Sequence, residues 1–231
     1  MLEISPAEWT AILLSLRVAV IATLVATPFG IALAWLLARK DFWGKSVLDA
    51  VVHLPLVLPP VVTGYLLLLT FGRRGLVGGF LADYLGIVFA FRWTGAALAC
   101  GVMSFPLLVR PIRLSIEAVD RRLEQASSTL GASPWKVFAT VTLPLALPGV
   151  LAGMVLGFAK AIGEFGATIT FVSNIPGETQ TISSAIYSLI QTPDGDAAAS
   201  RLVMISIGIA VLALIASEWF ARRATQRLHG N

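Results

Sequence analysis

The chain has 231 residues, of which 57% are hydrophobic and only 13% are charged. A soluble domain carries roughly 25% charged residues, so this chain has too few to cover a water-facing surface. The composition excludes a disordered chain, a collagen, a solenoid and, because Cys100 is the single cysteine, a disulfide scaffold. It predicts an all-α polytopic membrane protein. The net charge of +4 does not indicate nucleic acid, since the basic residues are scattered between apolar segments.

Five apolar stretches are long enough to cross a hydrocarbon core, which takes about 20 helical residues. In chain order they are Trp9–Ala38, Val47–Phe71, Thr94–Leu114, Leu143–Ile162 and Leu202–Phe220. Ser5 and Glu8 form a capping-box pattern that predicts the start of the first helix. A sixth crossing through residues 76–91 or 165–190 is the alternative. Asp83 and four glycines interrupt the first of these, which favours an interfacial or re-entrant segment.

The distribution of basic residues predicts the orientation of the chain. Eleven lie in the first loop, the third loop and the tail: Arg39, Lys40, Lys45, Arg110, Arg113, Arg121, Arg122, Lys136, Arg222, Arg223 and Arg227. Five lie on the other side: Arg73, Arg74, Arg92, Lys160 and Arg201. With five crossings, this bias places the N-terminus outside and both the third loop and the C-terminus in the cytoplasm.

The third loop has the pattern of two short helices joined by a glycine. The spacing predicts a helix over residues 115–130 that Gly131 closes, and a second helix that begins at Ser133 and Pro134. The apolar residues of this loop are Leu123, Ala126, Leu130 and Trp135. A surface loop with ordinary caps is one interpretation. A rigid, partly apolar projection that docks into a partner's groove is the other, and we favour it.

At these residues the chain resembles the permease subunits of binding-protein-dependent ABC importers. Their cytoplasmic loop reads Glu-Ala-Ala, three residues, Gly, nine residues, Ile, any residue, Leu-Pro. Here Gln125–Ser127 occupies the first three positions, Gly131 follows at the right distance, and Val141–Pro144 ends the motif. Glu124 stands one position early, which leaves open whether a carboxylate contributes to docking. The resemblance implies these ATPase-coupling residues: Gln125, Ala126, Gly131, Ala132, Pro134, Leu143 and Pro144.

Two further segments, His53–Leu69 and Gly163–Pro193, resemble the permease subunits of molybdate importers. That resemblance covers nearly the whole chain and implies the type I ABC importer fold: one transmembrane domain over residues 1–231, with a coupling loop at residues 115–144. It also implies a homodimer in the bacterial inner membrane, two ABC ATPase subunits and a periplasmic oxyanion-binding protein. A sulfate, thiosulfate or tungstate importer is the alternative of the same class. A gradient-driven secondary transporter is the alternative of another class, although neither repeat halves nor a chain of intramembrane acids is visible.

Candidate translocation residues lie where polar or helix-breaking groups interrupt the apolar spans. Pro59 and Pro60 remove backbone donors and predict a break, which forms either a gate or a packed kink. Glu164 is costly in lipid and indicates an interior or aqueous position. Nearby neutral groups that could line a path are Thr168, Thr170 and Asn174. The basic groups that could offset Glu164 are Arg17, Arg92, Arg110 and Lys160. We expect no tight substrate site, because a channel must release what it admits.

No enzyme motif is present. Gly44, Lys45 and Ser46 resemble the end of a phosphate-binding loop, but Arg39 stands where its first glycine is required. Metal-ligand spacings and nucleophile motifs are also missing. We therefore expect a non-enzymatic subunit without catalytic residues, metal or bound cofactor, in contact with membrane lipid and not with nucleic acid. ATP and Mg²⁺ would be used by the partner ATPase.

Overall fold

The computed structural model describes residues 4–229, without the side chains of Ser217, Glu218 and residues 220–229. The helices are α1 (Pro6–Arg39), α2 (Lys45–Val57), α3 (Pro60–Phe71), α4 (Leu76–Leu85), α5 (Trp93–Ala118), α6 (Arg121–Thr129), α7 (Pro134–Val137), η1 (Phe138–Thr142), α8 (Leu143–Ile162), α9 (Gly166–Val172), α10 (Ile182–Leu189) and α11 (Asp196–His229). The described part contains no strand, as the composition predicts. The side chains of the predicted tail residues Arg222, Arg223 and Arg227 lie outside the described part.

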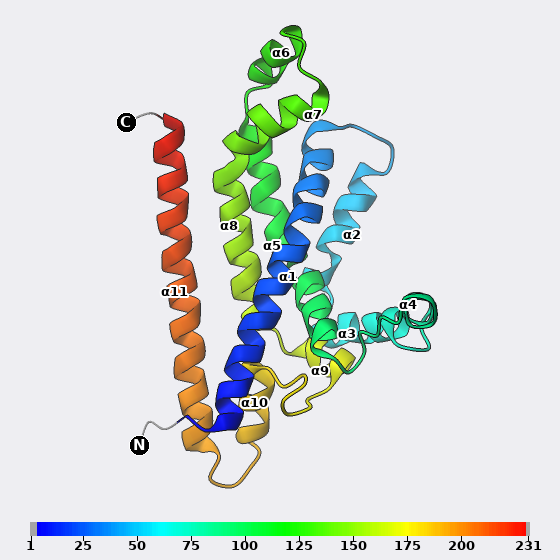
Figure 1. The fold of residues 1–231 in the computed structure, drawn as a ribbon, viewed down its shortest axis with the longest axis vertical. Helices are drawn as coiled ribbons and strands as arrows, with labels where there is room; N and C mark the ends of the chain where they lie inside the picture. Colours follow the sequence, from blue (N-terminus) through cyan, green and yellow to red (C-terminus); the bar gives the residue numbers. More distant parts are fainter. Residues whose placement is uncertain (1–3, 230–231) are drawn as a thin grey trace.

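Helices α1, α5 and α8 pack together as the core of a bundle, and α11 lies along its outer side against α8 (Figure 1). In the most apolar window of α5, 61% of the residues are buried, compared with 11% in α11. Small residues such as Ala19, Ala96 and Ala99 fill the core and allow the helices to approach closely. Helix α5 is therefore central, whereas α11 exposes most of its apolar surface.

Four helical segments are long and apolar enough to cross a membrane: α1, α5, α7 through α8, and α11 up to Ala216. The second predicted span is broken instead, because α2 and α3 meet at an angle of 116°. Pro59 and Pro60 lie at this break, where the sequence predicts it. The described part thus has four helical segments long enough to cross, and a fifth crossing if the bent pair is one span.

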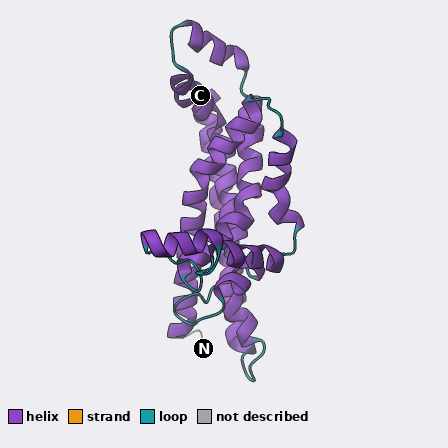
Figure 2. Cartoon of the chain, turned by 90° about the vertical axis from the view of Figure 1, so that its right-hand side faces the viewer, coloured by secondary structure: helices purple, strands orange, loops and turns teal. Residues whose placement is uncertain are grey.

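The alternative sixth crossing does not form. Helix α4 has only ten residues, and residues 165–190 contain two helices of seven and eight residues, α9 and α10. The α3–α4 segment runs across the long axis of the bundle (Figure 1, Figure 2). The interfacial or re-entrant position expected for residues 76–91 stays a prediction.

The predicted helix over residues 115–130 is wrong in one respect. Helix α5 ends at Ala118, and α6 begins only at Arg121. The cause is Asp120, whose Oδ1 accepts a hydrogen bond from the backbone N–H of Arg122 at 2.9 Å and so starts a new helix. Helices α6 and α7 lie at the same end of the bundle as the C-terminal end of α11, and the N-terminal end of α1 lies at the opposite end (Figure 1).

Candidate functional site

The glycine elbow of the predicted coupling loop, residues 115–144, forms as the sequence predicts. Helix α6 ends at Thr129, and Gly131 has φ of +84°, a conformation that L side chains rarely adopt. Its position is open, because an added Cβ would meet no atom within 4 Å. Ser133 Oγ then accepts a hydrogen bond from the Lys136 N–H at 3.4 Å, and α7 begins at Pro134. The elbow therefore depends on backbone conformation and not on packing.

The outer surface of the coupling loop is apolar and exposed. The relative accessibilities of Leu123, Leu130 and Trp135 are 50%, 89% and 76%. Helix α6 buries none of its residues. The remaining predicted coupling residues are the exposed Gln125, Ala126, Pro134 and Pro144 and the half-buried Ala132 and Leu143. Because removing large apolar side chains from water lowers the free energy, this surface is suited to binding a partner protein.

The inner surface of the loop is held by polar contacts around Glu124. Its Oε1 accepts a hydrogen bond from Thr142 Oγ1 at 2.6 Å and lies 3.1 Å from Arg39 Nη2. The Arg39 guanidinium also donates to the Val119 carbonyl oxygen at 3.0 Å. Within the chain, the Glu124 carboxylate is therefore engaged by Arg39 and Thr142. Sequence reasoning missed Arg39 and Thr142, since no local pattern links residues 85 and 18 positions from Glu124.

Two of the predicted pathway residues, Pro60 and Thr170, lie where α3 crosses α9. A Cβ on Gly64 of α3 would lie 2.5 Å from the Ala167 carbonyl oxygen of α9. A Cβ on Gly166 would lie 2.7 Å from Pro60 Cβ. We call this contact the α3–α9 crossing. The two glycines remove the side chains that would hold the helices apart, so the proline break and α9 are packed against each other.

Glu164 lies at the elbow between α8 and α9, and its accessibility is only 2%. Its Oε2 lies 2.6 Å from Lys160 Nζ, and its Oε1 accepts a hydrogen bond from the Ala167 N–H at 3.1 Å. Lys160 therefore compensates the buried charge, which is the role the sequence suggested for a nearby basic group. The carboxylate fixes the first turn of α9 relative to α8.

The neutral groups expected along the path are engaged within the chain. Thr168 Oγ1 donates to the Phe165 carbonyl oxygen and Thr170 Oγ1 to that of Gly166, both at 2.8 Å. Asn174 Nδ2 donates to Ser188 Oγ at 2.6 Å. The Asn174 Oδ1 is buried without a hydrogen-bond partner. In this conformation the two hydroxyls donate to backbone carbonyl oxygens at the start of their own helix.

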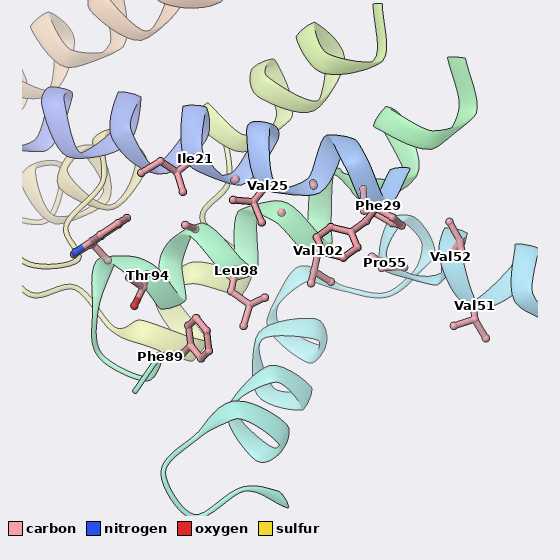
Figure 3. A pocket seen from close by; sticks show the side chains of 16 residues that line it. Ile21, Val25, Phe29, Val51, Val52, Pro55, Phe89, Thr94, Leu98 and Val102 are labelled. Atoms are coloured by element: carbon pink, nitrogen blue, oxygen red, sulfur yellow. The ribbon is translucent and has the colours of Figure 1, made fainter. Parts of the chain in front are cut away.

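A separate cavity of about 620 Å³ opens between α1, α2 and α5 (Figure 3). Its lining is almost entirely apolar and includes Val25, Phe29, Leu98 and Val102. None of the predicted pathway residues lines it. An oxyanion needs donors or positive charge, so this cavity is suited to apolar groups. Among the side chains that the structure describes, no group of three His, Cys, Asp or Glu could hold a metal ion.

Comparison with known proteins agrees with this geometry. The chain is 62% identical over 220 residues to the molybdenum transport system permease protein ModB of Escherichia coli K12, covering 95% of this chain and 96% of the relative. It is 58% identical to ModB of Haemophilus influenzae, covering 96% of each.

Solved structures show the same fold at low identity. A bacterial ABC transporter involved in the import of alginate superposes with a TM-score of 0.74 at 19% identity, covering 96% of this chain and 81% of the other. The MetNI methionine ABC transporter superposes with a TM-score of 0.68 at 15% identity, covering 96% of this chain and 100% of the other. Residues 26–226 match the family of binding-protein-dependent transport system inner membrane components. The helical bundle, the exposed glycine elbow and this match together establish that the chain belongs to that family of ABC importer membrane subunits.

Proposed function

We propose that this chain is the permease subunit of an ATP-driven importer that moves molybdate across the bacterial inner membrane. The observation that carries the proposal is the identity of 62% and 58% with two molybdenum permeases over nearly the full chain. The exposed elbow at Gly131 provides the structural counterpart, a surface on which a partner can act.

In the proposed complex, two copies of the chain form the channel and an ATPase subunit binds each coupling loop. ATP and Mg²⁺ belong to those partners, and a periplasmic binding protein delivers the oxyanion. The apolar side chains Leu123, Leu130 and Trp135 would be buried by the ATPase. Closure of the ATPase pair would then move the loops and switch the opening of the bundle from one side to the other.

The orientation we propose places the coupling loop and the C-terminal end of α11 in the cytoplasm. The common location of these two segments at one end of the bundle supports this orientation (Figure 1). The distribution of basic residues also supports it, because eleven lie in the segments assigned to the cytoplasm and five on the other side. The N-terminal end of α1 then faces the periplasm, where the binding protein would dock.

The proposed path passes the α3–α9 crossing. Pro59 and Pro60 lie at the start of α3. Thr168 and Thr170 lie on α9, and Glu164 and Asn174 lie two residues before and after it. An anion would not be repelled strongly there, because Lys160 neutralises Glu164. A pathway whose lining binds the anion only weakly is suited to a channel whose specificity is supplied by a separate binding protein.

A sulfate importer is the second candidate, since the chain is also 36% identical to a probable sulfate transport system permease protein of Chlorella vulgaris. Both oxyanions carry two negative charges, so this subunit alone discriminates poorly between them. Thiosulfate and tungstate importers belong to the same alternative. A gradient-driven transporter would need no ATPase, and the exposed coupling surface favours the ATP-driven class.

Uptake into proteoliposomes tests the proposal. Vesicles containing this chain with its ATPase and binding protein should accumulate labelled molybdate when ATP is supplied on the coupling-loop side. Excess tungstate should compete, while sulfate should compete weakly. Uptake that persists without ATP and stops when ionophores collapse the ion gradients would contradict the ATP-driven class. Uptake of sulfate in preference to molybdate would favour the second candidate.

A further inference from the structure

The connection between the coupling loop and the rest of the bundle is narrow. Helix α6 packs mainly on α7 and η1, and none of its residues is buried. Beside it, a cavity of about 480 Å³ opens between α6, α7, η1 and the end of α1. Apolar packing therefore contributes little to holding α6, and the polar contacts of Glu124 are the main link from this helix to α1.

Three side chains from three elements meet at that link. Arg39 is the last residue of α1, Glu124 lies on α6, and Thr142 ends the π-helical turn η1. Arg39 and Glu124 are shielded from water, with side-chain accessibilities of 9% and 18%. Thr142 is buried, and its hydroxyl donates to the same Glu124 oxygen that the guanidinium contacts. A shielded charged hydrogen bond is stronger than an exposed one, so this group resists separation.

Helix α1 is also attached at its other end. Glu8 Oε1 lies 2.9 Å from Arg201 Nη2 of α11, and Ser15 Oγ accepts a hydrogen bond from the Ile182 N–H of α10 at 2.7 Å. With 34 residues, α1 spans roughly 50 Å between these attachments. Helix α1 therefore links the Arg39 end to α10 and α11 at the far end of the molecule.

We propose that Arg39, Glu124 and Thr142 form a clasp that makes α6 and α1 move as one body. Movement that an ATPase imposes on the coupling loop then reaches the opposite end of the bundle through α1. These residues are positioning residues, since none of them is required to touch substrate or nucleotide. The proposal rests on the proposed function, because it needs an ATPase at the coupling loop.

The test measures molybdate moved per ATP hydrolysed by the reconstituted complex. Glu124→Gln keeps the side-chain size and removes the charge. We expect this variant to bind the ATPase as the native chain does, to hydrolyse ATP, and to move about tenfold less molybdate per ATP. The control is Glu117→Gln, which removes another arginine-paired carboxylate at the end of α5, 2.8 Å from Arg113, and should leave the ratio unchanged.

A charge exchange separates coupling from mere stability. The single variants Arg39→Glu and Glu124→Arg should both lose transport per ATP, and the double variant should recover a severalfold part of the loss. If Glu124→Gln does not fold, Thr142→Val carries the same test, because it removes only the 2.6 Å hydrogen bond.

Three results would overturn the clasp: an unchanged ratio in Glu124→Gln, an equal loss in Glu117→Gln, or a double variant no better than the single ones. Failure of the proposed function looks different, because the native chain itself would then bind no ATPase. In that case the clasp fails with it. Normal ATPase binding together with unchanged transport per ATP rejects the clasp alone.

Discussion

The coupling loop and the α3–α9 crossing both depend on glycine, but for different physical reasons. At the elbow, Gly131 is needed for its positive φ, and the space around it is empty. At the crossing, Gly64 is needed for space, because the α9 backbone lies where its Cβ would be. The first region is exposed and held by polar contacts, whereas the second is buried and held by close packing.

This difference separates docking from folding. A larger side chain at the elbow meets no atom of its own chain, so its effect falls on a partner that approaches from outside. A larger side chain at the crossing pushes two helices apart inside one chain. Substitutions at the elbow should therefore impair binding of the partner, whereas substitutions at the crossing should lower the stability of the fold.

The largest effect is expected from Gly64→Leu. Its Cβ would lie 2.5 Å and 2.9 Å from the carbonyl oxygen and Cα of Ala167, which are backbone atoms that move only with α9. We expect a loss of about 3 kcal/mol or more in stability, seen as a lower thermal midpoint in detergent. Gly208→Ala on α11 is the control, since its Cβ would meet nothing within 4 Å. Equal midpoints for both variants would contradict close packing at the crossing.

Glu164→Gln should have the next largest effect. It leaves Lys160 without its carboxylate partner, and because Lys160 is partly exposed we expect a cost of about 2 kcal/mol, below that of a fully buried pair. The double variant Lys160→Met with Glu164→Gln should recover much of the loss, since no uncompensated charge remains. Thermal unfolding of the three chains measures this. A double variant as unstable as the single one would show that the ion pair is not the cause.

Asp120→Ala should weaken the coupling loop without disturbing the crossing. It removes the carboxylate that accepts the Arg122 N–H at the start of α6, which typically costs about 1 kcal/mol. Hydrogen exchange should become faster in the first turn of α6 and stay unchanged in α9. Faster exchange in both helices would mean that the two regions are not independent.

The smallest effect concerns pH and the loop between α1 and α2. A hydrogen bond from Lys45 Nζ to Asp41 Oδ1 at 2.8 Å, with the attraction of the ammonium, lowers the pKa of Asp41 below its ordinary value of 3.8. Because the folded pKa is the lower one, the pair stabilises the fold above the ordinary pKa and loses this contribution as the pH falls through the folded pKa.

The corresponding measurement compares the native chain with Asp41→Asn. The native chain should have a slightly higher thermal midpoint near neutral pH, and the difference should disappear as the pH falls below the ordinary and then the lowered pKa of Asp41. Since the Asp41 side chain is 93% exposed, salt should also reduce the difference. A difference that grows as the pH falls would contradict this sign.

Much of the fold could be predicted from the sequence, because it follows from local patterns. Apolar length predicts the spans, the Ser5–Glu8 capping box starts α1 as expected, and the Gly131 spacing predicts the elbow. The proline break between α2 and α3 was also predictable.

The rest depends on contacts between distant residues. The 116° angle is set by what α3 packs against, and no sequence pattern shows that Gly64 meets Ala167. The Lys160–Glu164 pair is local, at i and i+4, and could be suspected. The contact between Arg39 and Glu124 joins residues 85 positions apart and could not be predicted from a local pattern. Asp120 was overlooked as a helix start because the apolar spacing continues across it.

The proposed function requires that an ATPase binds this chain at the exposed elbow. The most direct test is co-purification of the ATPase subunit with the native chain, Gly131→Trp and Gly86→Trp. The control is matched, since Gly86 also has positive φ, +66°, and open space, but ends α4. We predict that the native chain and Gly86→Trp capture the ATPase and that Gly131→Trp, although inserted in the membrane, does not. Capture of the ATPase by Gly131→Trp to the native extent would contradict the account.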